Sequence, residues 1–449
     1  MKAEGAVPFR ALVGAYLGLI VVGTGLLCLP WATPPAHPIS PLDAAFTATS
    51  AVCVTGLVVR DTGADFTLFG QLVILALIQL GGLGIMTFSM LVLSALGGRL
   101  SLASRSILTL TLAGDGRRMR LGPLLRVVVR FTLIVELAGA GLLFLRFWGP
   151  EGAARAAYAA LFHSISAFCN AGFSLWSTSL MAYRGDILVN LVVMGLIILG
   201  GVGFLVLHEG HRLWKRRQPL SLHSKVTLAT TGWLLVIGAL GLWLMERRDG
   251  LAGMPASEQL VAAAFQTVSA RTAGFNTIDL AGLTPGGLFF LMLLMFIGGS
   301  PGSCAGGIKT TTVGVLVLAA WNRIRGRSRV NVFRRTLGRA TLENAVTITI
   351  AGMLVTLAGL FALLSFQAPH SSLRELHGDF AAYLFEAISA LGTVGLSVGV
   401  TSQLAPASRV VVILLMFLGR LGPLTVAIAL TRQSAHPGWQ HPEEDVMVG

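Results

Sequence analysis

Long apolar runs recur along the whole chain and define its architecture. The first, residues 11–29, carries no charged side chain, and about 20 apolar residues in a helix are enough to cross a bilayer. Similar runs occupy residues 71–96, 121–148, 186–208, 226–245, 284–320, 345–366 and 408–430. The pattern predicts an all-α polytopic membrane protein with eight spans. Because further spans follow the first run and it lacks an A-x-A cleavage site, we interpret it as a span and not as a signal peptide.

Composition and charge placement agree with a lipid environment and orient the chain. Only 12% of residues are charged, against about 25% in soluble domains, and the mean hydropathy is +0.77. Lys and Arg concentrate in the loops that follow the second, fourth and sixth spans: Arg99, Arg105, Arg117, Arg118, Arg120, Arg126; Arg212, Lys215, Arg216, Arg217, Lys225; Arg323, Arg325, Arg327, Arg329, Arg334, Arg335 and Arg339. The positive-inside rule therefore predicts that both termini are cytoplasmic. Because orientation accounts for the arginines, we expect no nucleic-acid partner.

The four cysteines indicate neither a disulfide framework nor a zinc site. They are Cys28, Cys53, Cys169 and Cys304, and they lie in or beside apolar segments without a C-x-x-C pair. We expect them to be small buried side chains.

A shorter motif recurs between the paired spans, at residues 43–57, 158–173, 261–275 and 383–396. Each copy has a Phe, then a Ser four residues later, then a Gly before Leu or Phe. The Phe–Ser pairs are Phe46/Ser50, Phe162/Ser166, Phe265/Ser269 and Phe385/Ser389. The Ser-to-Gly gap is six residues in three copies and five in the third. A helix of about 10–12 residues is too short to cross a bilayer, so each copy predicts a re-entrant half-helix followed by extended chain.

The extended chain after each half-helix offers carbonyl oxygens to a cation. The half-helix enters from outside, and its C-terminal end carries partial negative charge into the membrane. Four such loops around one axis would give rings of carbonyls able to replace the hydration shell of a potassium ion, with Gly allowing close backbone approach. The predicted filter residues are Val54, Thr55, Gly56, Asn170, Ala171, Gly172, Thr272, Ala273, Gly274, Thr393, Val394 and Gly395. Potassium is the expected transported ligand, and no organic cofactor is expected.

A second glycine motif recurs in the even-numbered spans: GGLG at 81–84, GGVG at 200–203, GGSPG at 298–302 and GRLG at 419–422. The third copy expands to GGSPGSCAGGIKTTT over 298–312. Gly costs a helix about 1 kcal/mol and Pro about 3, so the sixth span is predicted to break and place a polar loop beneath the filter. In the fourth copy Arg420 replaces the second Gly, and a charge at that depth is a functional candidate.

The filter segments, the SPGSCAGGIKTTT loop and the GRLGPLT segment together resemble the Trk/Ktr/HKT superfamily of potassium transporters over essentially the whole chain. With no additional helix pair before the first span, the bacterial Ktr membrane subunit is the nearest likeness. The resemblance implies a homodimer of four-repeat pores on a cytosolic ring of nucleotide-binding regulatory subunits. It links Gly at all four filter positions to potassium selectivity, whereas relatives with Ser in the first repeat favour sodium.

The resemblance also implies that the broken span is the gate and that Arg420 faces it. The gate residues are Gly298, Gly299, Ser300, Pro301, Gly302, Ser303, Cys304, Ala305, Gly306, Gly307, Lys309 and Arg420. Cys304 departs from the Thr or Gly expected there. Lys309 either anchors the lower end of the loop or extends toward the membrane interface.

These motifs divide the chain into repeats at residues 1–98, 99–220, 221–330 and 331–432, with a cytoplasmic tail at 433–449. Two transport alternatives stay open: a secondary transporter of another small solute, and a sodium-coupled potassium symporter. An enzyme is not expected. Its candidates would be Glu136, His163, His208, Glu209 and His211, but H-E-G-H is not the H-E-x-x-H zinc motif. We expect His163 to pack and Glu136 to pair with a polar neighbour.

Overall fold

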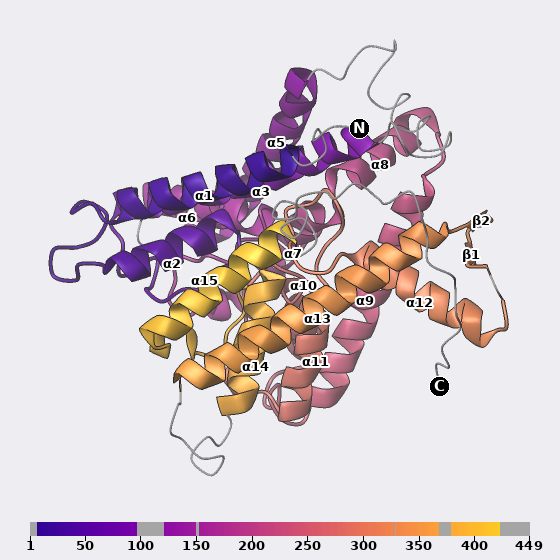
Figure 1. Ribbon diagram of the computed structural model, residues 1–449. Coiled ribbons are helices and arrows are strands. Elements are labelled where there is room, and N and C mark those ends of the chain that lie inside the picture. The colour runs from indigo at the N-terminus through magenta and orange to yellow at the C-terminus, as the bar shows by residue number, and fades with distance from the viewer. Residues whose placement is uncertain (1–6, 97–120, 150–151, 328, 368–378, 423–449) are drawn as a thin grey trace.

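The computed structural model describes residues 7–96, 121–149, 152–327, 329–367 and 379–422. The arginines at 99–120, the predicted tail at 433–449 and the end of the last predicted span therefore lie outside the described residues. Helices make up most of the described chain, and longer loops join them (Figure 1). A small hairpin of β1 (Asn331–Val332) and β2 (Arg335–Thr336) interrupts the helices.

Each predicted span has a helical counterpart in the described chain. In order they are α1 (Val7–Leu27), α3 (Leu68–Leu96), α5 (Leu121–Phe147), α7 (Ile187–Val202) with α8 (Phe204–Arg216), α9 (Leu222–Glu246), α11 (Pro285–Phe296) with α12 (Thr310–Ile324), α13 (Arg339–Gln367) and α15 (Pro406–Leu421). By length and composition, three described helices can each cross a membrane alone: α5, α9 and α13. The bent pair α7–α8 would make a fourth, and α1, α3 and α11 contribute shorter apolar stretches.

The fourth span differs from the prediction, which ran it straight through residues 186–208. Helix α7 ends at Val202 and α8 leaves at an angle of 101°. The turn is at Gly203, whose φ of 95° suits glycine. A Cβ there would lie 2.7 Å from the Pro301 carbonyl oxygen, and the Phe204 N–H donates to the Gly302 carbonyl at 3.1 Å. The chain therefore bends because the Gly-rich loop of another repeat occupies the straight path.

Four short helices lie between the spans: α2 (Pro41–Val52), α6 (Ala153–Phe168), α10 (Ala256–Ser269) and α14 (Asp379–Gly392). They have 12 to 16 residues, somewhat more than the expected 10–12. Helix α2 shows how they begin: the Ser40 side chain accepts from the Asp43 N–H at 3.1 Å, and Pro41 occupies the first turn. The repeated Phe of each short helix is fully buried.

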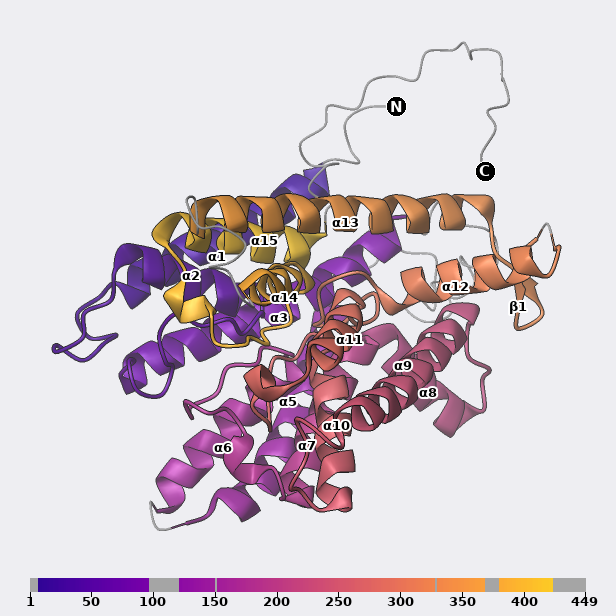
Figure 2. The same ribbon diagram turned by 90° about the horizontal axis from the view of Figure 1, so that it is seen from below.

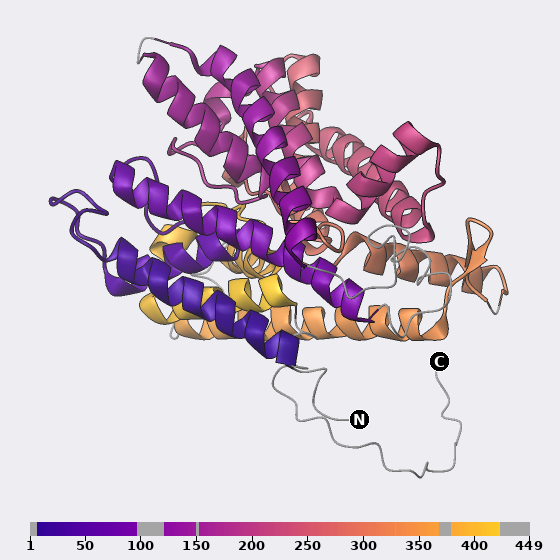
Figure 3. The ribbon, with the colours of Figure 1, turned by 90° about the horizontal axis from the view of Figure 1, so that it is seen from above.

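The short helices are packed in cyclic order. Each contacts a span of its own repeat and also a span of the preceding repeat: α2 contacts α15, α6 contacts α3, α10 contacts α7 and α14 contacts α11. The first and last repeats therefore meet, and Figures 1 and 2 show indigo α2 beside yellow α15. Seen from above, the second and third repeats occupy one side of the molecule and the first and fourth the other (Figure 3). This arrangement brings the four loops that follow the short helices to one centre.

Candidate functional site

The loops after the four short helices form a closed ring, which we call the four-loop ring (residues 54–56, 170–172, 272–274 and 393–395). Its four glycines have φ between 68° and 95°. A Cβ added to any of them would come within 2.1 to 2.7 Å of a carbonyl oxygen in the next loop. The pairs are Gly56 with Ala171, Gly172 with Ala273, Gly274 with Val394, and Gly395 with Thr55. The ring is therefore built from backbone, and a side chain at these glycines would displace it.

The first residue of each loop also has a left-handed backbone. These residues are Val54, Asn170, Thr272 and Thr393, with φ between 49° and 69°. Such values are uncommon outside glycine and are costly for β-branched side chains. The same positive φ at four equivalent positions indicates that the ring needs this backbone conformation in every repeat. Strained backbone of this kind clusters at functional sites.

The repeated serines hold the ring in place. In every repeat the N–H of the middle loop residue donates to the serine carbonyl, at 2.7 to 2.9 Å. The hydroxyl of Ser389 also accepts from the Gly395 N–H at 3.1 Å and donates to the Leu396 carbonyl at 2.7 Å. Ser50 likewise accepts from the Gly56 N–H at 3.1 Å. Sequence analysis used these serines only to mark the repeats, and their fixed spacing from Phe was the signal of a role.

The missing residue of the third repeat is explained by the end of its short helix. Helix α10 ends at Ser269 itself, whereas α2 and α6 continue two residues beyond their serines. The loop still joins the ring, because Thr272 and Gly274 keep positive φ and the Ala273 N–H still donates to Ser269 at 2.9 Å. The deletion therefore shortens the helix and spares the ring.

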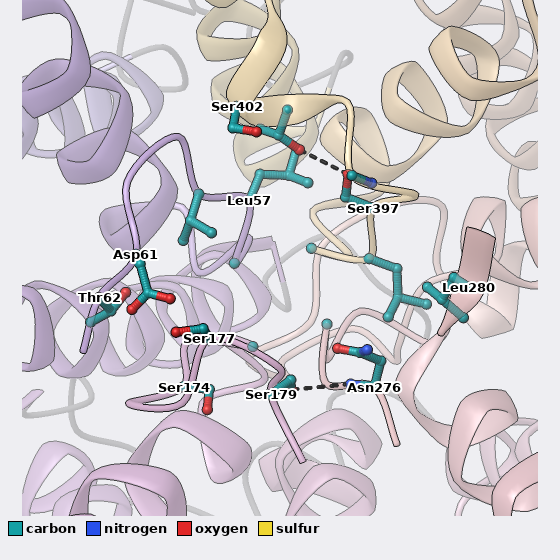
Figure 4. Close-up of a pocket in the computed structure, with 18 of the residues that line it drawn as sticks. Leu57, Asp61, Thr62, Ser174, Ser177, Ser179, Asn276, Leu280, Ser397 and Ser402 are labelled. Atoms are coloured by element: carbon teal, nitrogen blue, oxygen red, sulfur yellow. Dashed lines mark hydrogen bonds between the residues drawn. The ribbon is translucent and has the colours of Figure 1, made fainter. Parts of the chain in front are cut away.

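A cavity of about 420 Å³ opens next to the ring and is lined by all four loops (Figure 4). Its walls are polar: Ser177, Asn276 and Ser397 come from the second, third and fourth repeats and surround it with Asp61 from the first. The Asn276 N–H donates to the Ser179 hydroxyl at 3.3 Å, which joins two of the loops. The sequence motifs did not include these residues. A polar residue two positions after the Gly was the available signal in the second, third and fourth repeats, whereas Leu57, Val58 and Val59 follow Gly56 in the first.

The glycine motifs of the even-numbered spans pack against the ends of the short helices. A Cβ on Gly81, Gly200 or Gly419 would lie 1.8 to 2.0 Å from the carbonyl oxygen of Val52, Phe168 or Leu391 respectively. These glycines therefore allow a close approach of span and short helix. In the third repeat, a Cβ on Gly298 would instead lie 2.1 Å from the Gly306 carbonyl oxygen.

The sixth span is broken, as predicted: α11 ends at Phe296 and α12 begins at Thr310. The Gly-rich loop between them (residues 297–309) is hydrogen-bonded to protein. The Gly298 N–H donates to the Ile308 carbonyl at 2.8 Å, and the Ser300 and Cys304 N–H groups donate to carbonyls of α7 at 2.9 and 3.1 Å. Such bonds are required for non-helical backbone at membrane depth.

The Gly-rich loop lies against the four-loop ring. A Cβ on Gly306 would be 2.1 Å from the Thr393 hydroxyl oxygen, and Thr393 is the first ring residue of the fourth repeat. The Lys309 amine donates to the Ala305 carbonyl at 2.7 Å. Of the two interpretations of Lys309, this contact matches an anchor of the loop.

Arg420 joins the Gly-rich loop to the first repeat. Its side chain is 2% exposed and is held by backbone oxygens. One terminal nitrogen donates to the Gly81 carbonyl at 2.8 Å, and the other donates to the Cys304 carbonyl. The Tyr16 hydroxyl donates to the same Gly81 oxygen at 2.8 Å. The guanidinium, which has only donors, thus bridges two distant segments.

The remaining polar candidates have structural partners. The Gln79 amide donates to the Glu136 carboxylate at 3.1 Å. The His163 ring stacks on Trp176 with ring centres 4.2 Å apart. The Glu209 carboxylate accepts from the Ser221 N–H at 2.9 Å. These contacts agree with the expectation that Glu136 pairs and His163 packs.

Fold and site together define a polytopic helical membrane protein in which four short helices and the loops after them meet at one polar, backbone-lined centre. This is the architecture of a membrane transport protein. The chain belongs to the TrkH family of cation transport proteins, whose sequence profile matches residues 17–437. Members of this family are transporters, so the chain is not an enzyme.

Relatives share the whole length of the chain. Ktr system potassium uptake protein B of Bacillus subtilis (strain 168) is 39% identical over 447 residues, covering 98% of this chain and 97% of that protein. The protein of the same name from Vibrio alginolyticus is 39% identical, covering 100% and 96%. The potassium/sodium uptake protein NtpJ of Enterococcus hirae is 35% identical, covering 98% and 97%. The solved potassium transporter TrkH from Vibrio parahaemolyticus matches with a TM-score of 0.74 at 21% identity, covering 96% of this chain and 85% of that one, which shows the fold.

Proposed function

We propose that this chain takes up potassium through the four-loop ring, which acts as its selectivity filter. The observation that carries the proposal is the closed cyclic contact of the four ring glycines with the carbonyls of neighbouring loops. Full-length relatives named as potassium uptake proteins support it. The filter residues are those of the ring: Val54, Thr55, Gly56, Asn170, Ala171, Gly172, Thr272, Ala273, Gly274, Thr393, Val394 and Gly395.

The chemistry of the ring suits a weakly held, dehydrated cation. Backbone carbonyls arranged in rings replace the hydration shell without charge, so the ion can bind and leave again. The C-terminal ends of the four short helices add partial negative charge at the same place. Within the described chain, the buried hydroxyls of Thr55, Thr272 and Thr393 have no hydrogen-bond partner. Their oxygen atoms are further ligands for a cation close to the proposed path.

The Gly-rich loop and Arg420 act as the gate in this proposal. The contact of Gly306 with Thr393 supports a loop placed directly on the path leaving the filter. A fixed positive charge near that path raises the barrier to a cation. The two carbonyls that hold Arg420 belong to Gly81 and Cys304, so opening would require this bridge to break.

The same proposal extends to assembly and placement. The chain forms a homodimer in a bacterial inner membrane, with both termini cytoplasmic and with a cytosolic ring of nucleotide-binding subunits that regulates it. Two relatives are named protein B of a Ktr system, and this name supports an assembly of more than one kind of protein. The charge distribution supports the orientation.

Rubidium flux into proteoliposomes tests this function. Flux that follows an imposed voltage without sodium is expected of a potassium-selective pore. Flux that requires sodium would favour the sodium-coupled alternative. One relative is named a potassium/sodium uptake protein, so the test includes this alternative. Absence of flux under every condition, with protein that is folded and inserted, would contradict the proposal.

A further inference from the structure

Two cysteines from different repeats meet beneath the filter. Cys169 caps the C-terminal end of α6, and Cys304 lies in the Gly-rich loop. Their sulfur atoms lie 2.8 and 3.5 Å from the point where a Cβ on Gly82 would be. The two sulfur atoms are therefore at most about 6.3 Å apart, since both lie close to the same point. Both residues are 1% exposed, so each thiol has the other as a close neighbour in a confined space.

The pair has a polar setting on one side. The Cys169 thiol donates to the Gln79 side-chain oxygen at 3.5 Å and lies 3.9 Å from a Glu136 carboxylate oxygen. Gln79 and Glu136 belong to α3 and α5, so this cluster joins two spans to a short helix and to the Gly-rich loop. Neither the filter chemistry nor the Arg420 bridge uses these thiols.

We propose that Cys169 and Cys304 form a reversible disulfide under oxidation, and that this cross-link locks the Gly-rich loop against the filter. Two S–H bonds break and one S–S bond forms, while two protons and two electrons pass to the oxidant. A diazene oxidant such as diamide accepts them and becomes the hydrazine. A dithiol reductant restores both thiols by exchange, through a mixed disulfide.

The cross-link would hold the Gly-rich loop at Cys304, the residue whose carbonyl binds Arg420 in the proposed closed gate. The Cys304 carbonyl accepts from Arg420, and its N–H donates to the Gly200 carbonyl at 3.1 Å. Cys169 directly precedes Asn170, the first ring residue of its repeat. A bond between the two sulfurs would thus tie the Arg420-binding residue to the filter of the second repeat. The locking effect rests on the proposed gate, whereas formation of the disulfide does not.

The chain offers a matched control in Cys53. It caps α2 in the first repeat as Cys169 caps α6 in the second, and it is equally buried. A Cys53→Ser variant therefore removes a thiol from the equivalent helix end and leaves the proposed pair intact. Cys28 is exposed and is replaced by Ser in all samples to remove a surface thiol.

The test uses the full chain in proteoliposomes, treated with diamide and then with dithiothreitol. Non-reducing digestion and mass spectrometry should find a peptide containing Cys169 linked to one containing Cys304. Rubidium flux should fall to a small fraction of its starting value and recover on reduction. Cys169→Ser and Cys304→Ser should each abolish the linked peptide and the loss of flux, and Cys53→Ser should retain both.

Three outcomes would overturn the inference. The linked peptide fails to form, or it forms without changing flux, or the diamide-induced loss of flux persists in Cys304→Ser. The second outcome rejects the lock alone, because the Arg420 variants described below test the gate without any oxidant.

Discussion

Arg420 is a buried charge that is held by carbonyl dipoles instead of a carboxylate. Its terminal nitrogens reach Gly81 and Cys304, on the first repeat and on the Gly-rich loop. Charged groups within a membrane protein are costly and are retained for function. A change to Lys separates the charge from the bridge. The planar guanidinium of Arg makes two directed hydrogen bonds, whereas the compact ammonium of Lys keeps the charge and does not reproduce both bonds.

We predict that Arg420→Ala raises basal rubidium uptake and weakens its dependence on the cytosolic partner, since both the barrier and the bridge are removed. Arg420→Lys keeps the charge and should give an intermediate increase. The measurement is initial flux, with and without the partner, for variants of equal insertion. Flux at or below the parent level in both variants would reject the gate assignment.

We predict that Gly56→Ser lowers the preference for potassium over sodium. The new Cβ would meet the Ala171 carbonyl at 2.4 Å, and φ is 95°, so the ring must deform and a hydroxyl enters it. A roughly tenfold drop in the permeability ratio would correspond to about 1.4 kcal/mol. Gly18→Ser is the matched control, because a Cβ there has nothing within 4 Å. Unchanged permeability ratios for serine at all four ring glycines would contradict the filter.

Among the elements, each loop of the four-loop ring is a short piece of strained backbone that is held by its own helix. The serine of the helix binds the loop at two or three points, and the strain of the left-handed residues is carried by these bonds. The hydroxyl of Ser389 makes two of these bonds, because it accepts from the N–H of Gly395 and donates to the carbonyl of Leu396.

We predict that Ser389→Ala lowers both thermal stability and potassium selectivity. It leaves a buried N–H and a buried carbonyl without their partner, at a cost of about 1–3 kcal/mol. Melting temperature in detergent and the permeability ratio are the measurements. Ser365→Ala is the control, because that exposed hydroxyl binds only within its own helix, to Phe361. Equal effects of the two substitutions would show that the Ser389 hydroxyl does not hold the loop in place.

The Gly-rich loop is the second element whose role can be tested. Deleting residues 302–304 removes the carbonyl that binds Arg420 and the carbonyl that binds Phe204. We predict higher basal uptake, because the shortened loop should no longer reach across the path. A deletion variant that inserts normally, retains its fold and shows lower flux would make the loop structural.

At the scale of the whole molecule, the ring closes only where the first and last repeats meet. Asp43 at the start of α2 binds Arg409 at the start of α15, and Arg60 lies 3.5 Å from the same carboxylate. The contact of α2 with α15 therefore completes the cycle of short helices.

We predict eight spans with both termini inside. In a background without the native cysteines, His37→Cys should react with an impermeant thiol reagent from outside. Arg118→Cys, in the loop after the second span, should react only after the inside is exposed. The reverse pattern would place the mouth of the cavity on the cytoplasmic side and refute the topology.

Features that depend on a few neighbouring residues could be predicted from the sequence. Apolar runs marked the spans, the Phe–Ser–Gly spacing marked the four short helices and their loops, and Gly298–Gly307 marked the break in the sixth span. These could be predicted because burial, helix length and positive φ are local demands on residue type.

Which distant segments meet follows from the packing of the repeats and could not be predicted from the sequence. The bend at Gly203, the two carbonyls that bind Arg420 and the meeting of Cys169 with Cys304 follow from the packing of different repeats. The residues at these contacts show no sequence pattern that identifies their partners, because a buried donor can form its hydrogen bond with any well-placed backbone oxygen. The partners are selected when the four repeats pack around one centre, and this packing depends on the whole chain.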